Sequence, residues 1–159
     1  MGFALSDIEL TSTAFRPHGG IPRRFSGEGD NISPPMEWRN PPGGTRGYAV
    51  ICHDPDAPLV SPNGTYGFVH WVLYNLPASV TSLPEGTDEF TTGWNDTGNL
   101  GYSGPMPPTG HGLHQYYFWI LALDVETNLA SGLTLWQLLE RIEANVIGMN
   151  RLVGAYERS

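Results

Sequence analysis

Hydrophobic positions along much of the chain follow the patterns of β-strands. Residues 6–13 alternate polar and apolar side chains, with Ile8 and Leu10 on one face. Residues 48–53 form a continuous apolar run, which is typical of a strand buried on both faces. Residues 68–76 and 116–124 are rich in aromatic and β-branched side chains, and residues 151–158 can form a short closing strand. The pattern therefore predicts a protein built mainly of strands.

One segment has the period of an amphipathic helix instead. Thr134 and Gln137 have the spacing of a capping box at a helix N-terminus. The apolar positions that recur at helical spacing after it are Leu135, Leu138, Leu139, Ile142 and Val146. Gly148 is the expected end, because glycine adopts the left-handed conformation that ends many helices. The sequence thus predicts one helix near the C-terminus.

Glycine and proline punctuate the rest of the chain, with 20 Gly and 14 Pro among 159 residues. Many of them lie in long connections at residues 16–40, 55–67, 77–103 and 104–113, and ordered connections of this length are usually functional. Such a composition argues against a helical bundle. We predict a single domain over residues 1–159, mostly β, with a sandwich or Greek-key pair of sheets and a C-terminal helix.

Charge narrows the class of partner. The chain has 16 acidic and 8 basic residues, a formal net charge of −8, and every basic residue is arginine. A sequence-independent nucleic-acid binder needs a basic surface, so we expect no nucleic-acid partner. The acidic balance likewise argues against strong binding to acidic membranes. Without lysine, the chain can form neither a lysine Schiff base nor a P-loop.

Cysteine use and sorting signals point to the cytoplasm. Cys52 is the only cysteine, so no internal disulfide forms, and its apolar neighbours predict a buried, unreactive thiol. No signal peptide or membrane-spanning segment is recognisable in the sequence. We expect a cytoplasmic protein.

Polar side chains interrupt or follow two of the predicted strands. Asp54 and Asp56 come directly after the apolar run, and two carboxylates two residues apart face the same way if the strand continues. A turn with an Asx cap is the alternative. His70 lies inside the aromatic strand 68–76, where a hydrogen-bonded core histidine is the alternative to a functional one. The residues that alternation places on its face are Phe68, Val72 and Tyr74.

His114 and Tyr116 give the strongest of these signals. They begin a strand directly after the Gly/Pro-rich loop and share one face by the two-residue period. Backbone N–H groups in such a loop can bind an anion, whereas an exposed histidine in a wide connection is the alternative. If the clusters converge, they form a small pocket with an acid, a base and hydrogen-bond donors. No cluster has zinc-site spacing, so we expect no metal or organic cofactor, although two histidines and an aspartate could form a facial triad.

Longer stretches resemble the phosphatidylethanolamine-binding protein family, in its bacterial and archaeal Raf-kinase-inhibitor-like branch. The stretches are DPDAP at 54–58, HWVLYNLP at 70–77, NDTGNLGYSGPMPPTGHGLHQYYFWILALD at 95–124, GMNRLVGAYER at 148–158 and FSGEGDNISPPMEW at 25–38. They cover nearly the whole chain, and their order and spacing make the resemblance specific. It implies a fold of two antiparallel β-sheets with a C-terminal α-helix and long ordered loops.

The resemblance also implies a small pocket at one end of the molecule that takes anions such as phosphate, phosphoryl headgroups or acetate. The pocket residues carried over are Asp54, His70, His114 and Tyr116, with Asp56 as support of the acidic motif. Met106 would offer its backbone N–H to the anion. The wall and the mouth of the pocket would be formed by Pro107, Pro108 and Phe68.

Some positions depart from the family pattern. Gln115 stands where the family usually has an arginine, so a cation that would brace the acidic motif by a bidentate pair is missing. Met106 stands at the usual position of a cysteine. His53 directly precedes the acidic motif and would add a third imidazole if its side chain turned toward the pocket.

These features support hypotheses from different classes. The first is a binding protein for a small anionic ligand, a soluble regulator with a kinase or protease as possible protein partner; its affinity would rise as pH falls through about 6–7. The second is an enzyme that uses Asp54, His70 and His114 for acid–base chemistry on a small aromatic metabolite. Its reaction would be a condensation, a cyclisation of the Pictet–Spengler type or an epimerisation, for example in secondary-metabolite biosynthesis. Regulation through the long loops and a homodimer also stay open.

Overall fold

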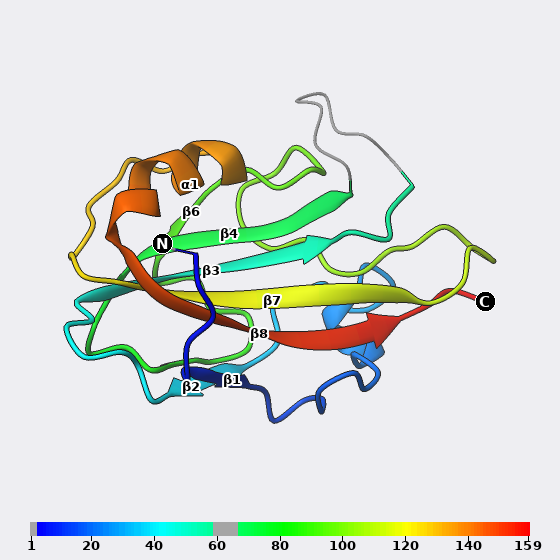
Figure 1. The fold of residues 1–159 in the computed structure, drawn as a ribbon. Helices are drawn as coiled ribbons and strands as arrows, with labels where there is room; N and C mark the ends of the chain where they lie inside the picture. Colours follow the sequence, from blue (N-terminus) through cyan, green and yellow to red (C-terminus); the bar gives the residue numbers. More distant parts are fainter. Residues whose placement is uncertain (1–2, 59–66) are drawn as a thin grey trace.

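The computed structural model describes residues 3–58 and 67–159, and its strands form two antiparallel sheets (Figure 1). The strands of the larger sheet, in spatial order, are β6 (Thr91–Thr92), β4 (Phe68–Pro77), β3 (Gly47–Asp54), β7 (His114–Leu123) and β8 (Val146–Tyr156). Those of the smaller sheet are β1 (Glu9–Thr11), β2 (Met36–Arg39) and β5 (Ser82–Leu83). The predicted mostly β fold is confirmed.

The larger sheet has Greek-key connectivity. In chain order the larger sheet uses β3, β4, β6 and β7, with β5 of the smaller sheet inserted between β4 and β6. The strand β4 pairs with both β3 and β6, and β7 returns to the far side of β3. The resulting spatial order β7-β3-β4-β6 is that of a Greek key. The long connection before β7 therefore crosses the end of the sheet.

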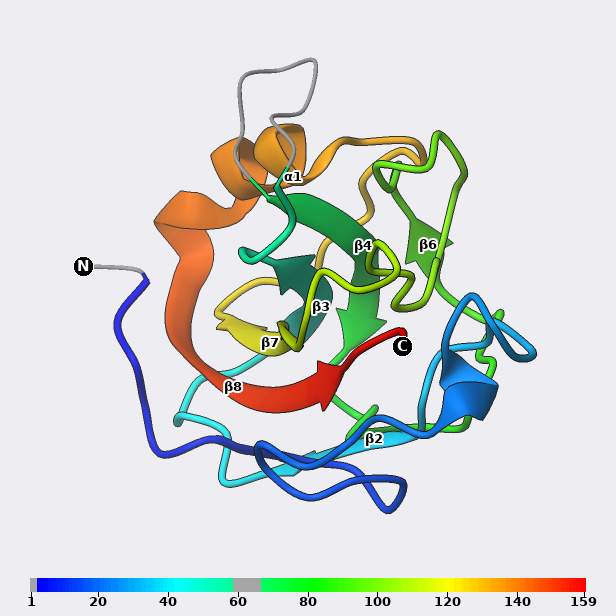
Figure 2. The same cartoon turned by 90° about the vertical axis from the view of Figure 1, so that its right-hand side faces the viewer.

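The larger sheet lies between the smaller sheet and the helix near the C-terminus (Figure 2), and an apolar layer packs against each of its faces. One lies between the sheets, where Trp38 of β2 packs edge-on against Tyr48 of β3 with ring centroids 5.4 Å apart. The other lies on the opposite face of the larger sheet, where the buried Leu138 and Ile142 of helix α1 (Leu135–Ile142) pack. The central strands β3 and β4 are thus buried on both faces over most of their length, which explains their continuous apolar runs.

The predicted start of the helix is confirmed, and its predicted end at Gly148 is wrong. The Thr134 hydroxyl accepts from the Gln137 N–H at 3.2 Å, and the Gln137 side chain accepts from the Thr134 N–H at 3.0 Å. The helix ends at Ile142, a 3-10 turn spans Glu143–Asn145, and Gly148 lies within β8. A Cβ at Gly148 would lie 2.6 Å from the hydroxyl oxygen of Ser6, so this glycine allows the N-terminal segment to cross the strand.

Other boundaries also differ from the prediction. The first predicted strand shrinks to Glu9–Thr11, and the closing strand lengthens to Val146–Tyr156. The predicted loop 16–40 contains a 3-10 turn (Arg23–Phe25) and β2, and the loop 77–103 contains β5 and β6. These added strands have two to four residues, too few for a periodic signal in the sequence. The connection 55–67 lies largely outside the described residues.

Cys52 is buried between the sheets, as predicted, and burial raises the pKa of its thiol. Among residues 3–58 and 67–159, no helix is long and apolar enough to cross a membrane.

Candidate functional site

A pocket of about 140 Å³ opens where β3 ends and where β4 and β7 begin. Strand alternation places its polar groups. In β3, Cys52 packs in the core between the sheets, and Asp54, two residues later, reaches the pocket. In β7, Phe118 packs in the same core, and Tyr116 and His114 reach the pocket. The site is therefore the polar end of the apolar layer between the sheets.

His70 reaches the same pocket through an irregularity in β4. Cys52 pairs with Trp71 and His53 pairs with Val69, so His70 is an extra residue at this β-bulge. The expected common face of residues 68, 70, 72 and 74 is wrong for the last two, since Val72 and Tyr74 pack on the helix side. The bulge turns His70 to the other side, against Phe68, with ring centroids 4.7 Å apart.

The structure brings together most of the predicted residues. Those that line the pocket are Asp54, Phe68, His70, Met106, Pro107, Pro108, His114 and Tyr116. The lining residues that sequence reasoning missed are Ala57, Pro58, Thr97, Ser103 and Gly104. All of these missed residues lie within the quoted family motifs, so the motifs located them although their side-chain chemistry did not. Asp56 is exposed and does not line the pocket.

The two aspartates of the acidic motif have different tasks. Asp54 is 2% exposed, and its Oδ1 accepts the Asp56 N–H at 2.8 Å, which closes a tight turn after β3. The Asp56 Oδ2 accepts the backbone N–H of Gln115 at 2.8 Å and so ties this turn to β7. Gln115 does not replace the missing arginine, since its Oε1 is buried without a hydrogen-bond partner among the described residues.

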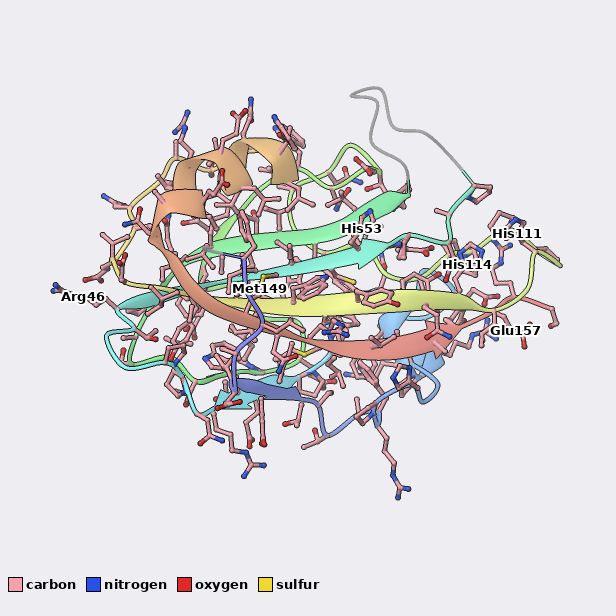
Figure 3. The ribbon with its side chains drawn as sticks, in the orientation of Figure 1. Arg46, His53, His111, His114, Met149 and Glu157 are labelled. Atoms are coloured by element: carbon pink, nitrogen blue, oxygen red, sulfur yellow. The ribbon has the colours of Figure 1, made fainter. Side chains whose placement is uncertain are left out.

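His114 is hydrogen-bonded at both ring nitrogens. Its Nδ1 lies 2.7 Å from Asp54 Oδ2, and its Nε2 lies 2.7 Å from the Nδ1 of His111 (Figure 3). His111 is thus the third imidazole of the site, which sequence reasoning missed although an H-x-x-H spacing is visible in GHGLH. His53 lies apart from this pair in Figure 3 and packs beside Gly67, so its side chain does not line the pocket. Within the described residues, no three His, Cys, Asp or Glu side chains converge as metal ligands.

His70 is held as a neutral imidazole. Its Nδ1 lies 2.6 Å from the carbonyl oxygen of Ser103, a pure acceptor, so this nitrogen carries the ring hydrogen. Burial lowers the pKa of His70 to about 4, against smaller opposing effects of the Ser103 hydrogen bond and the Asp54 carboxylate. At neutral pH its Nε2 therefore offers a lone pair.

The Tyr116 hydroxyl is buried without a hydrogen-bond partner among the described residues. Its ring packs edge-on against His70, with centroids 5.2 Å apart. Burial, with the nearby Asp54 carboxylate, raises the pKa of Tyr116, so the group stays protonated and is a hydrogen-bond donor.

The loop before β7 forms the rim. Gly104 donates its N–H to Asn31 Oδ1 at 2.6 Å, so this amide is not available to a ligand. Between residues 105 and 108, Met106 alone has a backbone N–H, because its neighbours are prolines. Its side chain is 48% exposed at the mouth, where it adds apolar surface.

Comparisons with known proteins agree with this architecture. Residues 11–157 match the family model described as phosphatidylethanolamine-binding protein. A UPF0098 protein of Methanothermobacter thermautotrophicus is 39% identical over 158 residues, which cover 95% of this chain and 99% of that protein.

Solved structures lead to the same family. A putative phosphatidylethanolamine-binding protein homologue from Chlamydia trachomatis superposes with a TM-score of 0.86 at 37% identity, over 96% of this chain and 98% of that one. YbcL of Escherichia coli, described as a member of the mammalian family, has a TM-score of 0.87 at 30% identity, over 97% and 100% of the two chains. This chain therefore belongs to the phosphatidylethanolamine-binding protein family.

Proposed function

We propose that the pocket binds a small ligand through an anionic group, a phosphoryl or a carboxylate. The Tyr116 hydroxyl carries this proposal, because a buried donor without a partner costs free energy unless a ligand satisfies it. An anionic oxygen is the strongest acceptor for such a donor. Family membership supports the same class of ligand.

The walls suit the organic part of such a ligand. Most of the lining is apolar, with Phe68, Met106 and Pro107 around the polar end. Pockets for small molecules commonly combine apolar walls with a few converging polar groups. A headgroup with a short carbon chain therefore fits better than a fully hydrated ion.

His70 makes binding depend on pH. Its Nε2 lone pair repels an anionic oxygen, so either the ligand brings a proton or His70 takes one up. Binding thus consumes a proton, and the affinity rises as pH falls from 7.5 to 6. The direction is that expected from the sequence, although His70 is neutral in the free protein.

Calorimetric titration with phosphorylethanolamine tests the proposal. Tyr116→Phe removes the donor, so we expect an affinity loss of roughly 10- to 100-fold, the usual value for a hydrogen bond to a charged group. Tyr117→Phe is the matched control, because this neighbouring side chain points away from the pocket and packs against Trp119. Titrations of the unchanged protein at pH 6 and 7.5 measure the proton coupling. Equal affinities of the two variants, or no binding by the unchanged protein, would sink the proposal.

The remaining sequence hypotheses have less support. A regulatory role with a kinase or protease partner, and a homodimer, stay predictions. The acid–base enzyme gains no support from the comparisons. Moreover, both nitrogens of His114 are engaged within the protein, so neither is open to a substrate unless a partner is displaced.

A further inference from the structure

His114 presents no open nitrogen to the pocket that it lines. Asp54 engages its Nδ1 and His111 engages its Nε2, each at 2.7 Å. His114 is 1% exposed, whereas His111 is exposed and is absent from the pocket lining. His111 therefore covers His114 from the solvent side and occupies the position that a ligand atom would need.

The hydrogens in this chain of contacts can be counted. An ionised carboxylate only accepts, so His114 Nδ1 carries a hydrogen toward Asp54. A single hydrogen then lies between His114 Nε2 and His111 Nδ1. Two hydrogens in this contact would repel each other, and without a hydrogen two lone pairs would face each other. With both rings neutral, His111 Nδ1 is the donor and His114 Nε2 accepts.

His111 is exposed and has open space beside its flanking glycines, whereas the backbone of the rim is held in place. Gly110 and Gly112 flank it with φ angles of 75° and 99°, and a Cβ at either position would meet nothing within 4 Å. Arg158 anchors the rim through two hydrogen bonds. Its backbone carbonyl accepts the Gly110 N–H at 3.0 Å, and its side-chain Nη1 donates to the Pro107 carbonyl at 3.2 Å.

We propose that His111 is an internal competitor of the ligand: its Nδ1 occupies His114 Nε2, and a ligand gains that nitrogen only when the His111 ring swings out. The inference rests on the proposed function and adds a residue that sets affinity and specificity. In the arrangement with both rings neutral, His114 Nε2 is an acceptor, so it suits a ligand that carries its own hydrogen.

That requirement separates phosphoryl ligands from carboxylates. A phosphate monoanion can donate its P–OH hydrogen to His114 Nε2 while its other oxygens accept from Tyr116. A carboxylate, which is ionised near pH 7, has no hydrogen to donate. Removal of the His111 side chain should therefore raise the affinity for phosphate and leave the affinity for acetate unchanged.

The test is a calorimetric titration of inorganic phosphate and of acetate at pH 7.0. We expect His111→Ala to bind phosphate about 2- to 10-fold more tightly than the unchanged protein. This factor is the net value of one hydrogen bond, because phosphate no longer has to displace the contact between His111 and His114. Acetate affinity should stay the same. Leu113→Ala is the control, because this side chain is 54% exposed in the same loop and does not line the pocket. It should bind both ions like the unchanged protein.

Nitrogen-15 NMR of the histidine rings tests the same contact without a substitution. In the unchanged protein, saturation with phosphate should shift the His111 Nδ1 resonance toward that of a solvent-exposed ring and should also shift His114 Nε2. Unmoved resonances at saturation would overturn the inference even if His111→Ala fails to fold.

The outcomes separate the two proposals. If the unchanged protein binds phosphate and His111→Ala binds it no more tightly, the competitor role is wrong and the anion pocket stands. If none of the variants binds phosphate, both are wrong. Phosphate binding by the unchanged protein that tightens in His111→Ala but not in Leu113→Ala supports both.

Discussion

At the scale of the residue, hydrogen-bond partners decide the chemistry of the pocket more than residue type does. His70 and His114 are both buried histidines, yet one has a free lone pair at Nε2 and the other has none. Each ring donates from Nδ1, to a carbonyl for His70 and to a carboxylate for His114, so the difference at Nε2 comes from the His111 ring. The same side chain thus has two roles within one site.

The lowered pKa of His70 predicts an acid-sensitive contribution to stability. An unfolded histidine has a pKa of about 6.5, so the unfolded chain binds the proton first as pH falls from 6.5 toward 4. The contribution is therefore fully present above pH 6.5 and is lost on acidification, by roughly 2–3 kcal/mol at pH 4.5. The groups that act on His70 besides burial are Ser103, Asp54, His53 and Asp96.

Urea unfolding at pH 7.0 and 4.5, in buffers without phosphate or carboxylate, measures this contribution. The His70→Gln variant lacks the titrating group, so its loss of unfolding free energy between the two pH values should be smaller than that of the unchanged protein by about that amount. Equal losses of unfolding free energy in the two proteins would show that His70 titrates alike in the folded and the unfolded state, which would contradict the prediction.

At the scale of the element, the site depends on the loop before β7 as much as on the strands. The strands supply the polar groups at their ends, and the loop closes the apolar wall over them. Close approach of backbones holds the loop in place: a Cβ at Gly104 would overlap the carbonyl oxygen of Phe25, and the Gly104 N–H donates to Asn31. Residue 104 must be glycine because the backbone of Phe25 lies so close to it, and not because of its φ angle.

Gly104→Ala should therefore displace the rim. We expect a loss of about 1–3 kcal/mol in unfolding free energy, as for other overpacked sites, together with weaker phosphate binding. Gly43→Ala is the control, since a Cβ there would meet nothing within 4 Å. Urea unfolding and calorimetry on both variants measure the two effects, and a Gly104→Ala protein that behaves like the control would contradict the role of this close approach.

At the scale of the whole molecule, the larger sheet separates the pocket from the helix. The pocket ends the layer between the sheets, whereas α1 packs on the opposite face of the larger sheet. Changes in the helix layer should therefore affect stability and leave the pocket alone, because additivity holds for sites without shared contacts.

Leu138→Ala tests this separation. The side chain is 0% exposed beneath α1, so its truncation should cost about 2–5 kcal/mol of unfolding free energy without changing ligand affinity at temperatures where the protein stays folded. Trp136 lies in the same helix and is 65% exposed, so Trp136→Ala should change the unfolding free energy by no more than about 0.5 kcal/mol. A change in phosphate affinity in either variant would show that the two layers are coupled.

Local patterns determined much of this architecture. The long strands were predictable because apolar runs report burial directly, and the helix start because Thr134 and Gln137 cap within one turn. The motifs around Asp54, His70 and His114 indicated residues that converge, since each lies at or near a strand end. These signals involve neighbours in the chain.

Tertiary structure alone decided the rest, because it depends on partners far apart in the sequence. Pairing with β7 ends the helix at Ile142 and carries β8 through Gly148. Register against β3 makes His70 the extra residue of a bulge and turns it into the pocket. The approach of the loop before β7 to Asp54 selects His111, and not His53, as the third imidazole. Local patterns indicated most of the polar residues of the pocket, and long-range pairing and packing decided which of their atoms remain open to a ligand.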